Sequence, residues 1–387
     1  MPFFAHPDIF WINAGPSNIT NNVFNIYNYH GDEKNIHLFK YPPFAYFTLA
    51  SQHLIFKPFI SSFEFFENTN DIHSYNQWFE SENIFQNLFF LKLFYLAADI
   101  FILIFILKLQ DKKPGQVESS LNRLTGFWAF SPFIIYSAYM YGQYDILPVA
   151  LIFYAFYLFK NEKYNSAFFI IGLAGALKHF PFLIAPVFFF AVSKNIIGRI
   201  KYFFLTIAPY IIIALFFINS ESFIRDVFLN SSDYITQSKL FIAGYIVILL
   251  LFLFNKKKEK NINSLIKFSF MIFAWYLICL EKFNPQFIIW LAPFLCFFAA
   301  GKSKSGIYLY LILIPVYFIY ITYLGVNSTN KLLLPMDNDI TMLPSVNSII
   351  SHYLKINYNI IIRYSKYIFN IILFLLFFVK IRFNEDI

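Results

Sequence analysis

Short polar stretches interrupt an otherwise apolar chain, and their residue types suit proton transfer and phosphate binding. The first reads Tyr-Gly-Gln-Tyr-Asp at 141–145 and lies in a tight turn between two apolar blocks. Gln143 and Asp145 are therefore expected at the mouth of a helical bundle, where they could bind substrate hydroxyls or a metal ion. The alternative is a helix cap, because the helix dipole favours an aspartate at a helix N-terminus.

A second polar stretch, Leu177–Pro181, contains Lys178 and His179 between two further apolar blocks. An ammonium group and an imidazole side by side could hold a phosphate. The alternative is a pair of side chains that extend to lipid headgroups at the membrane interface.

A third stretch runs from Glu281 to Phe287 and contains Lys282 and Gln286. A turn built on Asn284-Pro285 would explain those two residues. It would not explain Lys282 or Gln286, which we expect to bind substrate.

Two isolated aspartates complete the candidates. Asp8, in the N-terminal segment, could act as a general base, although an aspartate in a loop is more often simply solvated. Asp99 lies inside an apolar block, where a carboxylate must be neutral, paired or facing a cavity. We expect Asp99 to make a structural hydrogen bond to a neighbouring helix.

The sequence lacks the common soluble-enzyme motifs, with no phosphate-binding glycine loop, dinucleotide-binding glycine motif, zinc-protease helix or serine-hydrolase elbow. Cys279 and Cys296 both lie in apolar blocks and form no zinc motif. The net charge of +8 does not indicate nucleic acid, because the basic residues lie in short connectors between apolar blocks.

The elements that must position these residues are transmembrane helices. The chain has 387 residues, of which 58% are hydrophobic and only 13% are charged. A bilayer core about 30 Å thick needs roughly 20 apolar residues in a helix. We predict an all-α, polytopic bundle with about eleven spans, at 87–107, 124–140, 145–159, 165–178, 180–193, 202–218, 239–254, 268–280, 286–300, 305–323 and 361–379.

Alternate connectors between these spans hold most of the positive charge, with 18 of the 30 Lys and Arg residues in 53 positions. The positive-inside rule makes those connectors cytoplasmic. Residues 1–86 then form an extracytoplasmic, interfacial segment, and 87–387 form the transmembrane domain. The apolar block at 44–60 is expected to lie at the membrane interface, because 61–86 holds five acidic residues and no Lys or Arg. This topology places the N-terminus outside the cytoplasm with no span before it, which suggests that a first transmembrane helix is missing from the start of this sequence.

Taken in order along the chain, these motifs resemble the GT-C glycosyltransferases, and among them the mannosyltransferase-like branches. The resemblance covers most of 1–300, and each motif is short, so their shared order carries the similarity. The matching stretches are Tyr41-Pro42-Pro43, Phe94 to Asp99, Phe130-Ser131-Pro132, Gly142 to Asp145, Ala174 to Pro181 and Asn284 to Phe294.

The resemblance implies a transferase that moves a hexose, most commonly mannose, from a polyprenyl-phosphate donor to a glycan or lipid acceptor on the extracytoplasmic face. It assigns the base to a carboxylate of the first outer loop, here Asp8, and we take Asp145 as the second choice. The family often has a second acidic residue there, whereas Ile9 and Phe10 follow Asp8. Lys178, His179 and Lys282 would stabilise the leaving phosphate, and Gln143 and Gln286 would bind sugar or acceptor.

Such a reaction would invert the anomeric centre. These residues are compatible with a divalent metal but do not require one, and they indicate no other cofactor. The membrane would be a bacterial or archaeal plasma membrane or the endoplasmic reticulum. Two other functions compete: a transporter or flippase, which would gather polar groups at the bilayer midplane and often show repeats, and a non-catalytic family member.

Overall fold

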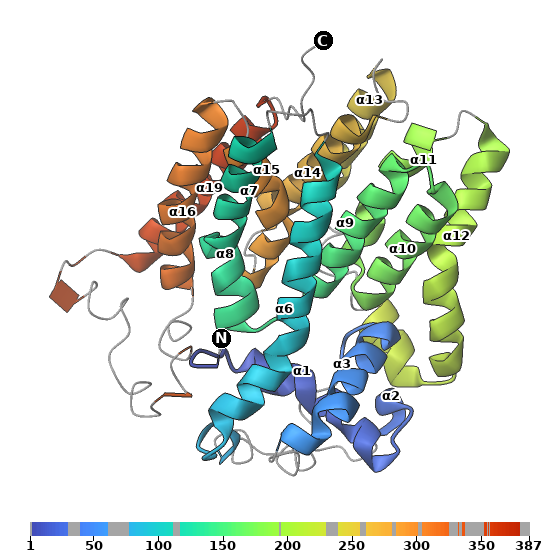
Figure 1. Ribbon diagram of the computed structural model, residues 1–387, viewed down its shortest axis with the longest axis vertical. Coiled ribbons are helices and arrows are strands. Elements are labelled where there is room, and N and C mark those ends of the chain that lie inside the picture. Colours follow the sequence, from blue (N-terminus) through green and yellow to red (C-terminus); the bar gives the residue numbers. More distant parts are fainter. Residues whose placement is uncertain are drawn as a thin grey trace.

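The computed structural model of the protein describes residues 2–29, 39–60, 77–110, 117–192, 195–229, 239–255, 261–280, 284–300, 304–324 and 357–379, with a few isolated positions between 332 and 355. Most residues in these ranges are helical, and no strand occurs in them. The predicted all-α, polytopic fold is therefore confirmed (Figure 1).

Five helices in the described ranges are long and apolar enough to cross a membrane. Several shorter apolar helices lie among them. The predicted count of eleven spans is not confirmed, because six of the predicted spans coincide with helical segments shorter than 18 residues. The five long helices are α6 (Ile84–Leu109), α12 (Ile196–Ala214, continued by η5, Leu215–Phe217), α14 (Ile262–Cys279), α16 (Lys304–Leu324) and α19 (Tyr358–Leu376).

The shorter segments complete the bundle. They are α7 (Val117–Ala129), α8 (Pro132–Ile134), the π-helical turn η3 (Ile135–Tyr141), α9 (Ile146–Lys160), α10 (Tyr164–Leu177), η4 (Phe180–Ile184), α11 (Ala185–Val192), α13 (Lys239–Phe254), the 3₁₀ turn η8 (Pro285–Trp290) and α15 (Ala292–Ala300).

Local sequence signals explain where several helices start. Asn195, Asn261 and Asn357 precede α12, α14 and α19, and each side-chain oxygen accepts a hydrogen bond from a backbone N–H of the first turn. Asparagine is among the best residues for this role, because it satisfies a donor that the helix itself leaves unpaired.

Small residues let neighbouring helices approach closely. A Cβ atom on Gly172 of α10 would lie 2.1 Å from the backbone oxygen of Thr206 in α12, so only glycine fits there. Close approach at small residues is the usual way in which helices associate in lipid, where apolar burial provides little driving force.

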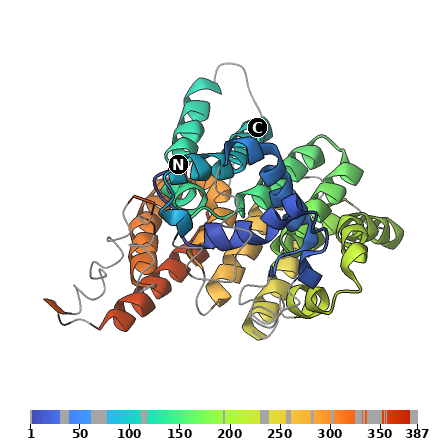
Figure 2. The ribbon, with the colours of Figure 1, turned by 90° about the horizontal axis from the view of Figure 1, so that it is seen from below.

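The N-terminal helices α1 (Asp8–Ser17), α2 (Ile26–Tyr29) and α3 (Pro43–Phe56) lie together across one end of the bundle (Figures 1 and 2). They share its hydrophobic core, to which Ile12, Tyr27 and Tyr46 contribute. The opposite end is marked by Lys160, whose Nζ donates to the backbone oxygens of Lys108 and Leu109 at 3.2 and 2.9 Å. The N-termini of α6 and α9 and the C-terminus of α10 therefore lie near the N-terminal helices.

Candidate active site

The carboxylate of Asp8, at the start of α1, is held by a neighbouring histidine and by a glutamine from a distant part of the chain. Gln143 donates from Nε2 to Asp8 Oδ2 at 2.9 Å, although the two residues are 135 positions apart. His6 Nδ1 lies 3.1 Å from Oδ1. The side chain of Asp8 retains 37% of its exposure, so its oxygens remain open to a ligand.

The neighbours of Asp8 set its protonation state. The imidazole of His6 stacks on the ring of Tyr141, with centroids 4.0 Å apart, and the Tyr141 hydroxyl also hydrogen-bonds to Asp8. Burial raises the pKa of Asp8. The hydrogen bonds from His6, Gln143 and Tyr141 and the charge on His6 together outweigh burial and hold the pKa below its usual 3.8. Asp8 is therefore ionised at neutral pH.

A sharp turn places Gln143 beside Asp8. Gly142 ends the π-helical turn η3 with φ of 80°, in the left-handed region that favours glycine. An added Cβ would lie 3.0 Å from Cδ1 of Ile9. Lys92 of α6, which is fully buried, donates from Nζ to the backbone oxygens of Phe4 and Tyr139, the latter at 2.7 Å. This lysine ties the N-terminal segment to η3.

Asp145 lies two residues further along the chain in a different setting. Its side chain is fully buried. Lys178 Nζ lies 2.7 Å from Oδ2, and Trp290 donates from Nε1 to Oδ1 at 2.7 Å. Although Asp145 precedes α9, its side chain caps no backbone N–H of that helix, so the capping alternative does not account for it.

The ammonium group of Lys178 lies over three aromatic rings. Its Nζ is 5.6, 5.2 and 5.4 Å from the ring centroids of Tyr41, Tyr144 and Phe287. Rings at this distance attract a cation through their negative faces. The lysine side chain retains 17% exposure, so its ammonium is reachable from outside the core.

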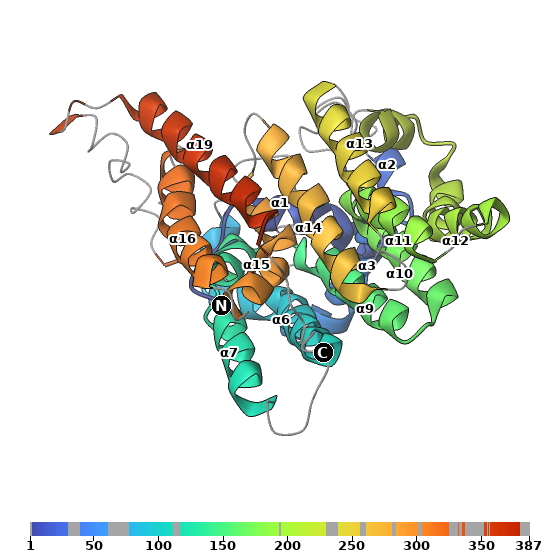
Figure 3. The ribbon, with the colours of Figure 1, turned by 90° about the horizontal axis from the view of Figure 1, so that it is seen from above.

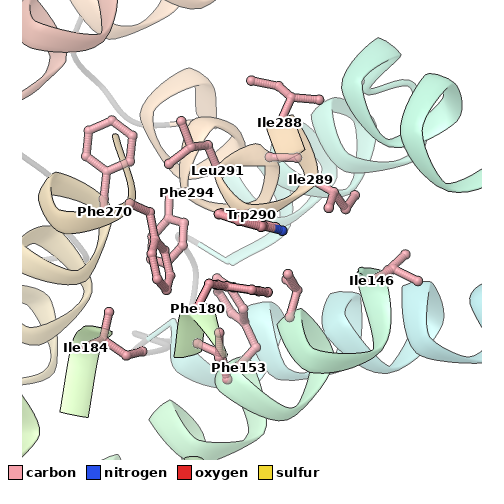
Figure 4. Packing of buried hydrophobic residues seen from close by; sticks show 14 of the residues in the cluster. Ile146, Phe153, Phe180, Ile184, Phe270, Ile288, Ile289, Trp290, Leu291 and Phe294 are labelled. Carbon is pink, nitrogen blue, oxygen red and sulfur yellow. The ribbon is translucent and has the colours of Figure 1, made fainter. Parts of the chain in front are cut away.

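Aromatic stacking orients the indole that bonds to Asp145. Trp290 lies parallel to Phe180, with centroids 4.0 Å apart, as Figure 4 shows. Phe287 stacks on Trp290 at 4.5 Å. Because the ring is held by these two neighbours, its N–H has a defined direction toward the carboxylate.

Tyr41 is influenced by the charges of both carboxylates. Burial raises the pKa of its phenol, and the negative charges of Asp8 and Asp145 raise it further. Its ring also meets that of Tyr144 edge-on, with centroids 5.2 Å apart. Tyr41 therefore lies within electrostatic range of both carboxylates.

Two buried amide oxygens at the site have no hydrogen-bond donor among the described residues. They are Oε1 of Gln143 and Oε1 of Gln286. The side chains are 2% and 4% exposed. A buried acceptor without a donor costs free energy, and ligand hydroxyl groups would provide donors.

His179 is paired with an aromatic hydroxyl. Its Nε2 lies 3.2 Å from the Tyr210 hydroxyl. Burial, together with the charge on Lys178, lowers the pKa of His179 to about 4. The imidazole is therefore neutral at pH 7 and offers hydrogen bonding rather than positive charge. Lys282, also predicted for this site, lies outside the described residues.

Asp99 takes the structural role predicted for it. Trp128 donates to Oδ1 at 2.6 Å, and the Tyr139 hydroxyl donates to Oδ2. Both partners come from neighbouring helical segments, which confirms the predicted inter-helix hydrogen bond. Within the described ranges, no three His, Cys, Asp or Glu side chains gather closely enough to hold a metal ion.

The structure adds His6, Tyr141, Lys92 and Trp290 to the residues predicted from the sequence. Lys92 carried a detectable signal, because a lysine within an apolar span is costly and must be accommodated. The other three are common interfacial residue types, and only their contacts distinguish them.

Comparison with known proteins agrees with this architecture. The family model described as glycosyltransferase family 87 matches residues 39–278, more than half of the chain. A search of curated proteins found no match.

Proposed function

Because the chain belongs to glycosyltransferase family 87 and is a multi-pass membrane glycosyltransferase, we propose that it transfers a hexose from a polyprenyl-phosphate donor to an acceptor hydroxyl at the site around Asp8 and Asp145. Mannose is the sugar that we favour, and we place the transfer at the extracytoplasmic face of the membrane. The observation that carries the proposal is that the ring centroid of Tyr41 lies 5.6 Å from the Lys178 ammonium, with Tyr41 within electrostatic range of the partly exposed carboxylate of Asp8.

The proposal assigns the base to Asp8 rather than Asp145. Asp8 is partly exposed and hydrogen-bonded by several donors, whereas Asp145 is buried and bonded to Lys178 and Trp290. A base must reach the proton that it removes. In this scheme Asp145 holds Lys178 in position.

In the reaction, the acceptor oxygen attacks the anomeric carbon while Asp8 takes its proton. The bond from the anomeric carbon to the phosphate oxygen breaks, and the electron pair leaves with the polyprenyl phosphate. Lys178 would stabilise the negative charge that develops on that phosphate. Attack from the face opposite the leaving group inverts the anomeric centre.

The amide oxygens of Gln143 and Gln286 would accept hydrogen bonds from hydroxyl groups of the sugar or the acceptor. A sugar presents many hydroxyl donors, which fits two buried acceptors that lack donors within the described part of the chain. All of these groups lie at one end of the bundle, which supports a transferase over a transporter with a midplane site.

The test is transfer of radiolabelled hexose from defined polyprenyl-phosphate donors by membranes that contain the protein. Asp8→Asn should lower the turnover rate by about 10²–10⁴-fold, the usual contribution of general base catalysis. Glu221→Gln provides the matched control, because Glu221 is exposed and outside the site. Unchanged transfer by Asp8→Asn would contradict the assignment of the base.

A further inference from the structure

A groove distant from Asp8 lies between α13, α14 and α19. Its volume is about 550 Å³. Figure 3 shows α14 between α13 and α19, and α14 contacts both. Most of its lining is apolar, with Val247 and Leu251 from α13, Phe268 and Met271 from α14, Phe374 from α19, and Phe378 just after α19.

The groove opens away from the core. Val247 and Leu251 are each 53% exposed, and Phe378 is 70% exposed. The surroundings of these helices are membrane lipid. A hydrocarbon chain is therefore the occupant that matches the lining without desolvating polar groups.

Two hydrogen bonds identify the ends of the groove. At one end Asn255 donates from Nδ2 to Oγ of Ser264 at 3.3 Å. Toward the other end Trp275 donates from Nε1 to the backbone oxygen of Phe241 at 3.2 Å. From Gly244 to Asn255 the rise of about 1.5 Å per residue gives a length of about 16 Å, roughly half of a 30 Å bilayer core.

Polar chemistry is concentrated at the Asn255 end. Among the described residues that line the groove, Lys267 is the only charged one, and it lies near the start of α14 with Asn255 close by. Basic pockets between transmembrane helices on the cytoplasmic side attract anionic lipid headgroups. This end lies on the side that the charge distribution makes cytoplasmic.

We infer that this groove binds one anionic phospholipid of the cytoplasmic leaflet, with its phosphate at Lys267 and an acyl chain along α13 and α14. A polyprenyl-phosphate donor fits the groove less well. Its phosphate must reach Lys178, and the end of α14 nearer that site is the one where Tyr276 packs on Trp290, with centroids 5.4 Å apart. Lys267, the charged residue of the groove, lies toward the other end of α14.

Native mass spectrometry of the detergent-solubilised full chain tests this inference. Phosphatidylglycerol, phosphatidylcholine and polyprenyl phosphate are added separately and in competition. We expect one phosphatidylglycerol to be retained in preference to phosphatidylcholine. Lys267→Met should reduce that preference about fivefold, as expected for one lysine near a lipid surface, and Lys267→Arg should retain it.

Matched variants distinguish headgroup recognition from general damage. Lys201→Met removes an exposed lysine from the same side of the bundle and should leave the preference unchanged. Val247→Trp should fill the groove and abolish retention of both phospholipids. Equal retention by Lys267→Met and Lys201→Met would overturn the inference, and so would displacement of phosphatidylglycerol by polyprenyl phosphate from the unmodified protein.

Discussion

The two carboxylates of the candidate site are both close to Gln143, yet their surroundings differ. Asp8 accepts a hydrogen bond from Gln143, and Asp145 follows Gln143 by two residues. Asp8 is partly exposed and receives hydrogen bonds from His6, Gln143 and Tyr141. Asp145 is fully buried and contacts the ammonium of Lys178. The comparison indicates that the carboxylate of Asp8 is accessible to a ligand, whereas that of Asp145 is paired with a cation inside the protein.

The largest expected effect follows from breaking the buried pair. Asp145→Asn retains an acceptor for Trp290 but leaves Lys178 without its counter-charge. Removal of one partner of a buried ion pair typically costs about 3–5 kcal/mol of unfolding free energy. The thermal midpoint of the detergent-purified protein measures it.

The control for this experiment is Arg225→Met, which removes the exposed partner of the Arg225–Asp226 pair. The Arg225 side chain is 53% exposed, so solvent screens its charge and its loss should lower the midpoint much less than Asp145→Asn does. If Asp145→Asn were as mild as that control, the buried pair would not stabilise the fold as described. The double variant Asp145→Asn/Lys178→Met should recover part of the loss if the two residues are coupled.

The next largest effect is expected on catalysis. Lys178→Met removes the ammonium assigned to the leaving phosphate while preserving most of the side-chain volume. Loss of one such electrostatic group typically lowers the turnover rate by about 10²–10³-fold. Rates with saturating donor measure it, and Lys160→Met at the opposite end of the bundle is the control. An undiminished rate would remove Lys178 from the mechanism.

The pH dependence of the transfer rate tests the ionisation of Asp8. Since its pKa lies below the usual 3.8, Asp8 stays ionised from neutral pH to below pH 4, and the acid limb of the rate profile should lie there. The same depressed pKa stabilises the fold above the unfolded-state value, and that stability is lost as pH falls through the folded-state pKa. His6→Gln removes a hydrogen bond and a charge, so the acid limb should move to higher pH.

A profile of transfer rate against pH for both proteins measures this shift. Lys201→Met, remote from Asp8, should leave the limb in place. A limb that stayed where it was in His6→Gln would show that His6 does not control the ionisation of Asp8.

The smallest effect is expected at the turn that joins the two regions. Gly142→Ala places a Cβ at a positive φ and 3.0 Å from Ile9. The cost is about 1 kcal/mol of unfolding free energy, with a several-fold loss of transfer as Gln143 shifts from Asp8. Gly126→Ala, where a Cβ meets nothing within 4 Å, is the control for both measurements.

Much of the fold could be predicted because membrane helices are encoded locally. Each of the eleven predicted spans coincides with a helical segment, but only five of these segments have the length of a full span. One predicted span, 286–300, contains two shorter segments, the 3₁₀ turn η8 and the helix α15, so its hydrogen-bond pattern changes partway along. A hydropathy run does not reveal such a break.

The site could be predicted only as a set of residues. Asp8, Gln143, Asp145, Lys178 and Gln286 stood out because polar groups are costly near a membrane core. Their partners could not be predicted. The two candidate roles of Asp145, as a helix cap or as a ligand-binding group, are equally compatible with its place before α9.

The sequence by itself determined the helices and the positions of the polar groups between them, because a chain in lipid must satisfy its backbone hydrogen bonds within each segment. Tertiary structure alone decided that Asp145 contacts Lys178, 33 residues away, and Trp290, 145 residues away, while Asp8 bonds to Gln143. No local rule relates positions so far apart. Their meeting depends on how α1, α9, α10 and η8 pack at one end of the bundle.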